Sequence, residues 1–542
     1  MPPTTLHDPL SQPRPFTRAD QSPEAPAPSR IAESSGGIWL GLIVATGVVT
    51  RAAGLDGGLW LDEIYGVVDY FRQPLGELLT VFRYDTQHPL YSVLAHLAIA
   101  AFGEHAWSAR LPAFLFGAGT VPMLYVLGRL VATRREALLA SALLAVSYHH
   151  VWFSQNARGY TALAFFALVT THLLIRALRE EHAAAWAGFA VAAAMGVFTH
   201  LTMVFVVAGQ ALIAIWFIAA PAAADPGGPY DTRVRARRPD WRWPAAGFSI
   251  AAALGLLLYA PILLQVVDFF LHRPSSLRGV STPGWALLES LRALQIGIGL
   301  AGLLAFMMVA ASGVWSYARQ NRLAFVCFVV PGVVTLAGAL AVRGTLYPRF
   351  FFFLAGFAML IAVRGALVIG RWLTARSMES VAARVARGEA IGTALACGMI
   401  VVSAASLAIN YRLPKQDFVG AMEFVNGRTA SGDLVAAVGP AAFVYRNYFA
   451  QPWDSIGSAG GFARLRSSGA PVWLLYVFPR YLEARDPELM ASITRDCRHT
   501  GRFPGTVGGG DVMVCRAEPA AVALVSSGTA AAASPSLPGP HP

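Results

Sequence analysis

The sequence predicts a mostly α-helical protein that crosses a membrane many times and carries a small α/β domain near its C-terminus. Of its 542 residues, 55% are hydrophobic and only 13% are charged, whereas a soluble domain carries about 25% charged residues. Long apolar runs recur between residues 37 and 411, and short apolar strands separated by helical stretches follow them. Most of the chain is therefore expected inside a lipid bilayer.

Membrane spans are expected wherever an apolar run is long enough to cross about 30 Å of hydrocarbon. These runs are 37–53, 110–131, 137–153, 159–177, 183–200, 201–220, 245–267, 290–313, 323–342, 350–370 and 390–410. The run 89–103 is shorter, since its residues rise only about 22 Å as a helix. We expect it to lie along the outer leaflet or to dip into it.

Arginine clusters between the spans predict the orientation. They are Arg129/Arg134/Arg135, Arg176/Arg179, Arg233/Arg235/Arg237/Arg238, Arg319/Arg322 and Arg371/Arg376/Arg384/Arg387. All lie on one side only if 89–103 does not cross, which gives about eleven spans with a cytoplasmic N-terminus. The expected location is the plasma or inner membrane. Because these loops account for much of the net charge of +11, a nucleic-acid partner is not expected.

The chain divides into four regions. Residues 1–36 are rich in Pro, Ser and charge, and 519–542 in Ala, Ser, Pro and Gly, so a disordered cytoplasmic N-terminus and a disordered tail are expected. Residues 37–411 form the membrane domain, whose first outer loop is 54–110. Residues 412–518 form the extracytoplasmic α/β domain, with a helix and three buried strands expected at 418–425, 434–438, 472–477 and 511–515.

Two cysteines of this domain bear on its location. Cys497 and Cys515 follow no metal-binding spacing. They can form a disulfide if the domain lies in an oxidising, extracytoplasmic compartment.

An acidic pair directly follows the first span, in Leu59-Trp60-Leu61-Asp62-Glu63. A carboxylate at a bilayer boundary is costly and marks a candidate functional site. Neighbouring side chains point in different directions, so one of Asp62 and Glu63 is expected to face a reacting group and the other a partner or metal. A carboxylate beside apolar surface suits general-base work on a hydroxyl or amine. The alternative is a pair that only caps a helix.

Polar residues also gather in the turn between two later spans, where Gln155, Asn156, Arg158 and Tyr160 lie close in sequence. An arginine can hold two phosphate oxygens at once. Gln155, Arg158 and Tyr160 are therefore candidate residues for binding a donor phosphate or sugar. The alternative is an Arg158 that ends a helix and extends its charge to the membrane surface.

Three further polar residues lie on the outer side in this topology. His88 is either a donor-binding residue or a hydrogen-bonded interfacial histidine. His200 lies between two apolar runs and is either a helix-capping residue or a ligand. Arg349 precedes Phe350-Phe351-Phe352 and is either a second phosphate contact or an interfacial anchor in an aromatic belt.

The sequence contains no phosphate-binding loop and no glycine-rich dinucleotide turn after a strand. Energy from nucleotide hydrolysis is therefore not expected, and a substrate should arrive already activated. Polyprenyl-phosphate-linked donors meet this requirement on the outer face of a membrane.

Four sequence segments resemble the family 39-type glycosyltransferases, a membrane superfamily that includes protein O-mannosyltransferases and lipid A aminoarabinose transferases. They are Leu59-Trp60-Leu61-Asp62-Glu63, His88-Pro89-Leu90-Tyr91, Ala109-Arg110-Leu111-Pro112 with Gly117, and Trp152-Phe153-Ser154-Gln155-Asn156-Ala157-Arg158-Gly159-Tyr160. The resemblance covers roughly residues 37–420 and is strongest over 59–180. It implies a GT-C fold, an inverting transfer from a polyprenyl-phosphate sugar, and Asp62 as the catalytic carboxylate.

One departure from the family pattern concerns a metal. Gln87-His88-Pro89-Leu90 replaces the commoner His-Pro-Pro-Leu, so either Gln87 or His88 occupies the family's histidine position. The sequence therefore leaves open whether a divalent metal binds. Its candidate ligands are Glu63, His88 and His200, and no other cofactor is expected.

The leading hypothesis is a glycosyltransferase that moves a sugar from a polyprenyl-phosphate donor to a lipid, glycan or protein acceptor of the envelope, in contact with membrane lipids. The alternative is a lipid or polysaccharide transporter without transferase activity. A transporter should show polar residues at mid-span and often repeated halves. Here the notable polar residues collect at one face and no repeat is apparent.

Overall fold

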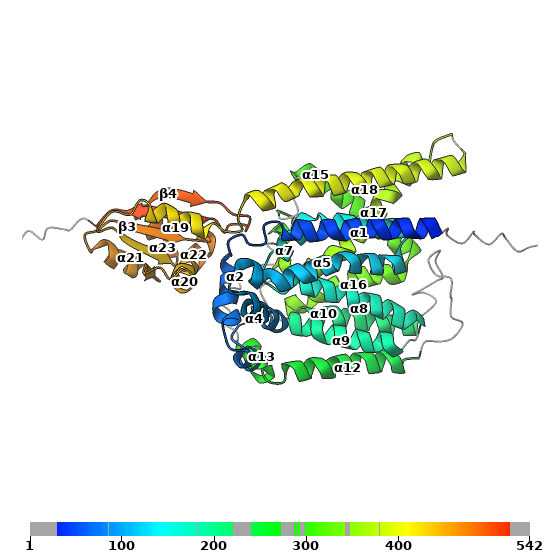
Figure 1. Cartoon of the computed structure of the whole chain (residues 1–542), viewed down its shortest axis with the longest axis horizontal. Coiled ribbons are helices and arrows are strands. Elements are labelled where there is room, and N and C mark those ends of the chain that lie inside the picture. Colours follow the sequence, from blue (N-terminus) through cyan, green and yellow to red (C-terminus); the bar gives the residue numbers. More distant parts are fainter. Residues whose placement is uncertain are drawn as a thin grey trace, which may run out of the picture.

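The computed structural model shows a bundle of long helices with an α/β domain attached at one end (Figure 1). It describes residues 30–520 except 85, 181–182, 221–239, 273–283, 285–286, 290, 293–298, 342–346 and 379. The predicted disordered segments lie outside the described residues up to residue 29 and from residue 521 onward. Helix α1 already begins at Arg30.

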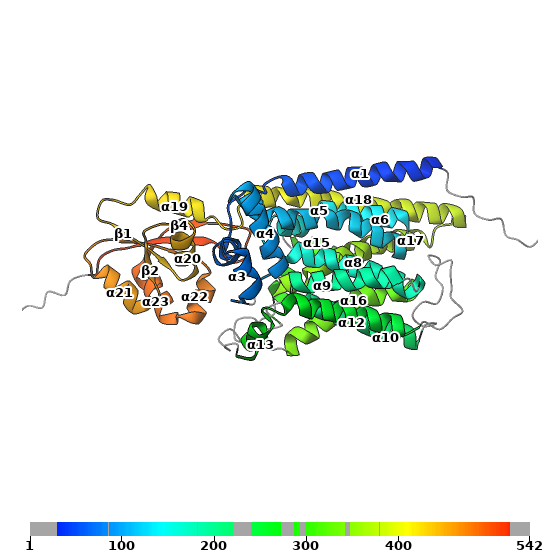
Figure 2. The same ribbon diagram turned by 60° about the horizontal axis from the view of Figure 1, so that its bottom comes forward.

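The membrane domain is built from helices that run side by side along the bundle (Figures 1 and 2). They are α1 (Arg30–Ala52), α5 (Ala106–Val131), α6 (Arg134–Ala145), α7 (Tyr148–Ser154), α8 (Tyr160–Glu180), α9 (Ala183–Thr199), α10 (Met203–Ala219), α12 (Arg242–Tyr259), α13 (Leu263–His272), α15 (Gly299–Gln320), α16 (Arg322–Ala341), the 3₁₀ helix η2 (Pro348–Leu354), α17 (Ala355–Thr374) and α18 (Val381–Arg412). Seven helices of the described part are long and apolar enough to cross a membrane, or eight if the bent pair α6–α7 is one span. The predicted number of about eleven stays a prediction.

The run 137–153, predicted as one span, is bent by 59° between α6 and α7. The buried guanidinium of Arg51 supplies a physical reason. It donates hydrogen bonds to the carbonyls of Leu144 (3.1 Å) and Ala145 (2.9 Å) at the end of α6. Carbonyls at a helix end have no partner within the helix, so this arginine stabilises the break.

The first outer loop folds into four short elements: α2 (Leu61–Gly66), the π-helix η1 (Val67–Phe71), α3 (Leu75–Thr80) and α4 (Pro89–Phe102). In both views they lie at the end of the bundle that faces the α/β domain (Figures 1 and 2). The segment 89–103, expected at the outer leaflet, is thus the helix α4 at this end.

The C-terminal domain is a five-stranded sheet with helices on both faces. Its strands are β1 (Leu434–Val438), β2 (Asp454–Ile456), β3 (Val472–Tyr476), β4 (Arg498–Phe503) and β5 (Val512–Ala517), in the order β2-β1-β3-β5-β4. β2, β1 and β3 are parallel, while β5 and β4 pair antiparallel. Helices α19 (Phe418–Asn426) and α20 (Pro440–Asn447) cover one face, and α21 (Ala459–Arg466), α22 (Pro479–Arg485) and α23 (Pro487–Asp496) cover the other.

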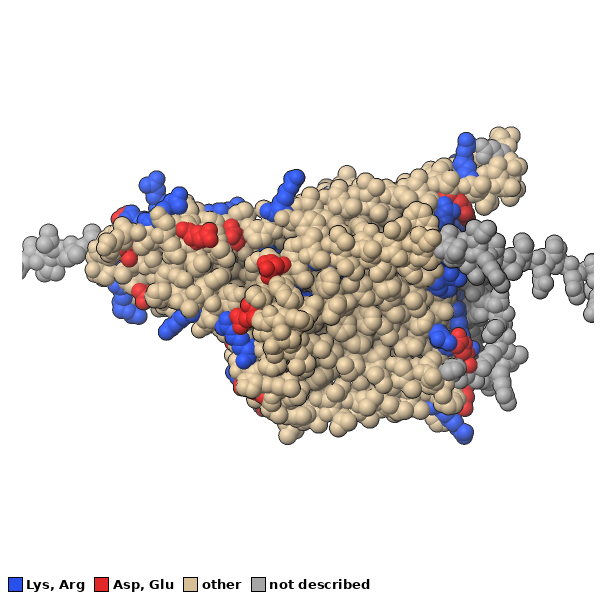
Figure 3. Space-filling view, viewed as in Figure 1, with Lys and Arg blue, Asp and Glu red and all other residues tan. Residues whose placement is uncertain are grey.

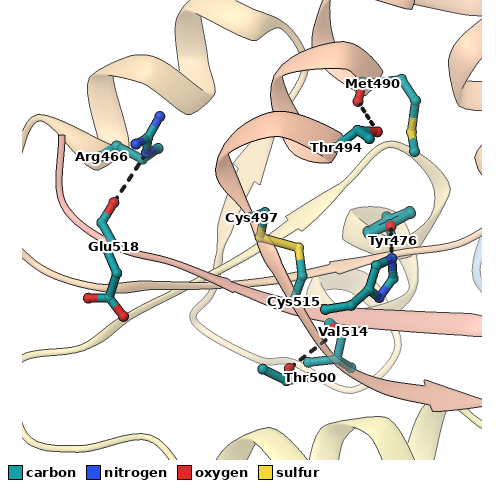
Figure 4. The surroundings of a disulfide bond; sticks show 10 residues. Arg466, Tyr476, Met490, Thr494, Cys497, Thr500, Val514, Cys515 and Glu518 are labelled. Atoms are coloured by element: carbon teal, nitrogen blue, oxygen red, sulfur yellow. Dashed lines mark hydrogen bonds between the residues drawn. A yellow bond between two sulfur atoms is a disulfide. The ribbon is translucent and has the colours of Figure 1, made fainter.

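A disulfide joins Cys497 and Cys515, with 5.6 Å between their Cα atoms (Figure 4). Cys497 directly precedes β4, and Cys515 lies in the neighbouring strand β5. The bond therefore links the edge strand of the sheet to its neighbour.

The α/β domain and the first outer loop share one hydrophobic core. Ile64 of α2 and Tyr70 of η1 belong to the same buried cluster as Val444 of α20 and Trp473 of β3. The sheet face covered by α19 and α20 is thus packed, through α20, onto the segment that carries Asp62.

Charged residues gather at the two ends of the bundle. On the face shown in Figure 3, the surface between them is nearly free of Lys, Arg, Asp and Glu. Basic side chains line the end opposite the α/β domain (right in Figure 3), and others lie on the α/β domain itself. A charge-free belt between charged ends is typical of a protein embedded in a bilayer.

Candidate active site

Asp62 lies in the first turn of α2 and forms an ion pair with Arg349 of η2. Its Oδ2 is 2.9 Å from Nη1 of Arg349. The two side chains are 21% and 26% exposed, so a ligand can reach both. A residue of the first outer loop and a residue 287 positions later therefore meet at one place.

Glu63 points the other way and is fully buried. Its carboxylate accepts hydrogen bonds from Nε (2.7 Å) and Nη2 (2.6 Å) of Arg110, and from the N–H groups of Ala157 (2.7 Å) and Trp60 (3.2 Å). Burial alone would raise the pKa of the Glu63 carboxyl, but Arg110 and Lys415 outweigh burial and hold this pKa below its usual value.

The Arg110 guanidinium fixes the loop that leads from α1 to α2. Besides Glu63, it donates to the carbonyls of Leu55 (2.8 Å), Gly57 (2.6 Å) and Gly58 (3.0 Å). Glu63 and Arg110 thus hold together α2, α5 and the turn that contains Ala157. We therefore propose a positioning role for Glu63 in place of the catalytic role expected from the sequence.

The side chain of Gln155 makes structural contacts instead of the donor contacts expected from the sequence. Its amide Nε2 donates to the carbonyls of Arg51 (3.1 Å) and Ala53, and its Oε1 accepts from Nδ2 of Asn410 (2.8 Å). The side chain is occupied in joining α1, α7 and α18. The structure does not bring it next to Asp62 as a free polar group.

Arg158 is buried, with only 4% of its surface exposed. Among the residues that the structure describes, no hydrogen-bond partner reaches its Nε. It lines a small cavity of about 10 Å³ together with Tyr70, Thr86 and His88. A buried polar group without a partner is costly, and a cavity of this volume holds about one water molecule beside Arg158.

His88 packs against the same turn. Its Nδ1 accepts a hydrogen bond from the Gly159 N–H at 2.8 Å. A Cβ at Gly159 would lie 2.8 Å from this nitrogen and 3.1 Å from a methyl group of Thr199, so only glycine allows the approach. The ring proton of neutral His88 is therefore on Nε2.

Three rings of this cluster lie together. His88 and His200 are 4.6 Å apart between ring centres, and Tyr160 is 5.5 Å from His88 and 5.3 Å from His200. Burial and then the charge of Arg158 lower the pKa of His88 well below its usual value. The same causes lower the pKa of His200 to about 3. Both imidazoles are therefore neutral hydrogen-bonding groups at physiological pH.

The element that carries Arg349 closes onto this cluster. The ring of Phe350 is 6.0 Å from that of His200, and the Arg349 guanidinium lies 4.5 Å from the Tyr347 ring. The structure thus brings Asp62 and Arg349 together directly. It brings Arg158, His88, His200 and Tyr160 together in the adjacent cluster.

The candidate metal ligands are engaged by other groups, although the rings of His88 and His200 lie together. The Glu63 oxygens are taken up by Arg110 and backbone N–H groups, His88 Nδ1 accepts from Gly159, and His200 Nδ1 accepts from the Thr202 N–H at 3.1 Å. Within the described ranges, no group of three His, Cys, Asp or Glu residues is placed to hold a metal ion. These residues, as they are arranged, therefore do not fit a metal site.

Sequence reasoning gave no role to three residues that shape the site, Arg110, Lys415 and Gln416, although Arg110 lies in one of the segments that resemble the family. Lys415 is buried, lies 4.0 Å from Glu63 and donates to the Gln155 carbonyl. One signal was present in the sequence, because Lys415 is its only lysine. A chain that uses arginine at every other basic position marks this one as different.

Comparison with known proteins supports the resemblance. Residues 86–224 match the family model described as dolichyl-phosphate-mannose-protein mannosyltransferase. The chain is 30% identical over 92 residues to the "Putative mannosyltransferase YkcB" of Bacillus subtilis (strain 168), a match covering 17% of this chain and 13% of that protein. The chain thus spans only a small part of this curated relative. The predicted resemblance to family 39-type glycosyltransferases is confirmed over the matched region.

One solved structure has the same fold as this chain. ArnT from Cupriavidus metallidurans in the apo state aligns with a TM-score of 0.51 and 15% identity, over 89% of this chain and 98% of ArnT. The same protein bound to undecaprenyl phosphate aligns with a TM-score of 0.49 and 12% identity, over the same shares of the two chains. The first alignment confirms the predicted GT-C fold with its C-terminal α/β domain.

Proposed function

We propose that this protein is a membrane glycosyltransferase that uses a polyprenyl-phosphate-linked sugar on the extracytoplasmic face. The observation that carries the proposal is the Asp62–Arg349 pair, which places a reachable carboxylate next to a cation. The charge of Arg349 and that of the buried Arg158 both act on His88 and His200, so two cations serve the same cluster. A transfer from a sugar phosphate needs a base for the acceptor and positive charge for the leaving phosphate.

In the proposed reaction, the acceptor displaces polyprenyl phosphate from the anomeric carbon of the sugar. Asp62 accepts the proton of an acceptor hydroxyl, and the acceptor oxygen forms a bond to the anomeric carbon from the face opposite the phosphate. The bond from this carbon to the phosphate oxygen breaks, and the polyprenyl phosphate leaves with the electron pair. Arg349 and Arg158 stabilise its charge, and the sugar is transferred with inversion.

An apolar cavity supports a lipid-linked donor. It has a volume of about 370 Å³ and lies between α4, α5 and α8. Its lining is Leu94, Ala98, Leu111, Pro112, Leu115, Phe116, Gly119 and Phe165. Helix α4 begins next to His88 and α8 begins next to Arg158, so both helices lead from the phosphate-binding cluster to this cavity. We assign it to the isoprenoid chain.

Two observations support an extracytoplasmic site. The disulfide between Cys497 and Cys515 is typical of oxidising compartments. The end of the bundle away from the α/β domain carries a row of arginines (Figure 3), as cytoplasmic loops do. The α/β domain and the site share the opposite end of the molecule.

The transporter alternative has less support. Its charged groups would line a path at mid-membrane, whereas Asp62, Arg158 and Arg349 all lie outside the long apolar helices or at their ends. The buried pair of Glu136 and Arg364 (2.8 Å) joins α6 to α17 near the other end of the bundle, since Glu136 lies in the first turn of α6.

Turnover of a defined donor tests the proposal. The full-length protein would be reconstituted in lipid vesicles with undecaprenyl-phosphate mannose, chosen because the matching family model carries mannose in its description, and with envelope glycolipids as acceptors. We expect release of undecaprenyl phosphate together with a glycosylated product identified by mass spectrometry. Movement of the donor across the vesicle membrane without its consumption would instead indicate the transporter, and other sugars would be tested in the same format.

A further inference from the structure

Gln416 connects the α/β domain to the first turn of α2. It is buried in the linker between α18 and α19. Its Oε1 accepts a hydrogen bond from the N–H of Leu61 at 2.9 Å, and its Nε2 donates to the carbonyl of Gly510 at 2.8 Å. The first N–H groups of a helix have no partner within it. Gln416 thus caps α2 from 355 positions away, one residue before Asp62.

The α/β domain holds the linker itself through backbone bonds. The N–H groups of Thr506 and Val507 donate to the carbonyls of Pro414 (2.9 Å) and Lys415 (3.1 Å). The loop approaches so closely that a Cβ at Gly510 would lie 2.8 Å from Nε2 of Gln416. The direction of the Gln416 side chain is therefore set by the domain.

A second contact holds the other end of the same segment. The rings of Tyr65 and Phe443 stack with 4.2 Å between their centres, and Arg72 donates to the Asn447 carbonyl at 3.3 Å. Between them lies the π-helix η1, a rare element that is frequently found at functional sites. The α/β domain thus contacts the segment formed by α2 and η1 at both of its ends.

We propose that Gln416 is a positioning residue for the transfer, through which the α/β domain fixes the first turn of α2 and with it the direction of the Asp62 carboxylate. The inference rests on the proposed function of Asp62. Helix α2 has only six residues, and so short a helix has little stability of its own. When Asp62 leaves Arg349 to meet an acceptor, the α2 backbone alone sets its direction. A misplacement of about 1 Å can lower a rate by about 10²-fold.

Three variants of the full-length protein test the proposal. Gln416→Met has a similar shape and loses both hydrogen bonds. Gln416→Glu, as the neutral acid expected at a buried position, keeps the oxygen that accepts from Leu61 and can donate its O–H to the Gly510 carbonyl. Thr506→Val is the matched control, because it removes the bond of 2.9 Å from Trp152 Nε1 to Thr506 Oγ1, which joins the same loop to α7 without touching α2.

The first measurement is hydrogen exchange of the amides of residues 61–66. We expect exchange to accelerate about tenfold or more in Gln416→Met, in which the Leu61 N–H has lost its partner, and to stay near wild type in Thr506→Val. Equal exchange in these two variants would overturn the proposal. Should Gln416→Met not fold, Gln416→Glu decides, because fast exchange there would contradict a role for the Leu61 contact.

The second measurement is the turnover of undecaprenyl-phosphate mannose. We expect Gln416→Met to lower kcat about 10- to 100-fold with little change in the KM of the donor, since Arg158 and Arg349 are untouched. Gln416→Glu should recover most of kcat, and recovery no better than in Gln416→Met would contradict the proposal. If the wild type does not turn the donor over, the proposed function fails, while the exchange data still report on the contact.

Discussion

The carboxylate of Asp62 and the guanidinium of Arg349 lie 2.9 Å apart and join α2 to η2. A carboxylate oxygen that is hydrogen-bonded to a guanidinium is not free to accept a proton from an acceptor hydroxyl. The donor phosphate offers Arg349 a stronger partner, so donor binding and release of Asp62 are expected to be coupled. An acceptor would then be deprotonated only when a donor is in place, which protects the donor from loss to water.

The role of Asp62 is tested by Asp62→Asn, which removes basicity with almost no change in shape. We expect turnover to fall by about 10² to 10⁴, with unchanged folding because the side chain is partly exposed. The measurement is the rate of polyprenyl phosphate release by purified protein in vesicles. Near-normal turnover would remove Asp62 as the base.

The adjacent residue supplies a control with the opposite outcome. Glu63→Gln leaves the buried Arg110 guanidinium without its carboxylate, and breaking a buried ion pair in this way costs about 3–5 kcal/mol. A clear loss of thermal stability in detergent is therefore expected, which Asp62→Asn should not show. Similar stability of the two variants would contradict the different roles assigned to these neighbours.

Sequence reasoning predicted the fold correctly from its apolar runs, and it selected Asp62 and Arg158 as site candidates from local patterns: a carboxylate after an apolar run and an arginine in a polar turn. It did not find that Glu63 pairs with Arg110 or that Gln416 caps α2. These contacts join residues 47 and 355 positions apart, and no local pattern encodes such distances. It also treated Gln155 as free, whereas carbonyls at the end of α1 use its amide.

Donor binding is tested by Arg158→Lys. Lysine keeps the charge but loses the planar group that holds two phosphate oxygens together, so we expect a KM for the donor several-fold to tenfold higher. Steady-state kinetics against donor concentration measures this. If Arg158 were only an anchor at the membrane surface, lysine would replace it without effect.

The protonation of Lys415 makes stability depend on pH. Burial, followed by the charge of Arg110, lowers the pKa of the Lys415 ammonium from 10.5 to about 7, although Glu63 opposes this. At a pH between the pKa of Lys415 in the folded protein (about 7) and its ordinary pKa (10.5), Lys415 is protonated more often in the unfolded chain than in the folded protein. The free energy of unfolding therefore increases as the pH rises through this range. The thermal stability of wild type minus that of Lys415→Met should therefore increase between pH 7 and pH 9.

The pKa of Lys415 can also be measured directly, because the chain has only one lysine. Protein labelled with ¹³C-lysine gives one side-chain NMR signal, whose titration reports the pKa. A midpoint near 10.5 would show that the ammonium stays charged in the folded protein and would remove the expected pH dependence.

The orientation is tested by single cysteines at two exposed positions. His105 lies between α4 and α5 at the end near the α/β domain, and Met378 lies between α17 and α18. In a background with the exposed Cys397 replaced by serine, a membrane-impermeant maleimide added to intact cells should label His105→Cys and not Met378→Cys. The reverse pattern would place the site in the cytoplasm.

The assignment of the apolar cavity between α4, α5 and α8 to the isoprenoid chain is tested by filling this cavity with a larger side chain. Gly119 lies in its lining, and a Cβ there would meet the Phe165 ring at 3.5 Å, so a larger side chain must extend into the cavity. Gly119→Phe should raise the KM of a donor with a long isoprenoid chain and leave that of a short-chain analogue nearly unchanged, because only the long chain occupies this volume. Gly41→Phe is the matched control, since an added side chain there meets nothing within 4 Å. Equal effects of Gly119→Phe on long and short donors would show that the chain binds elsewhere.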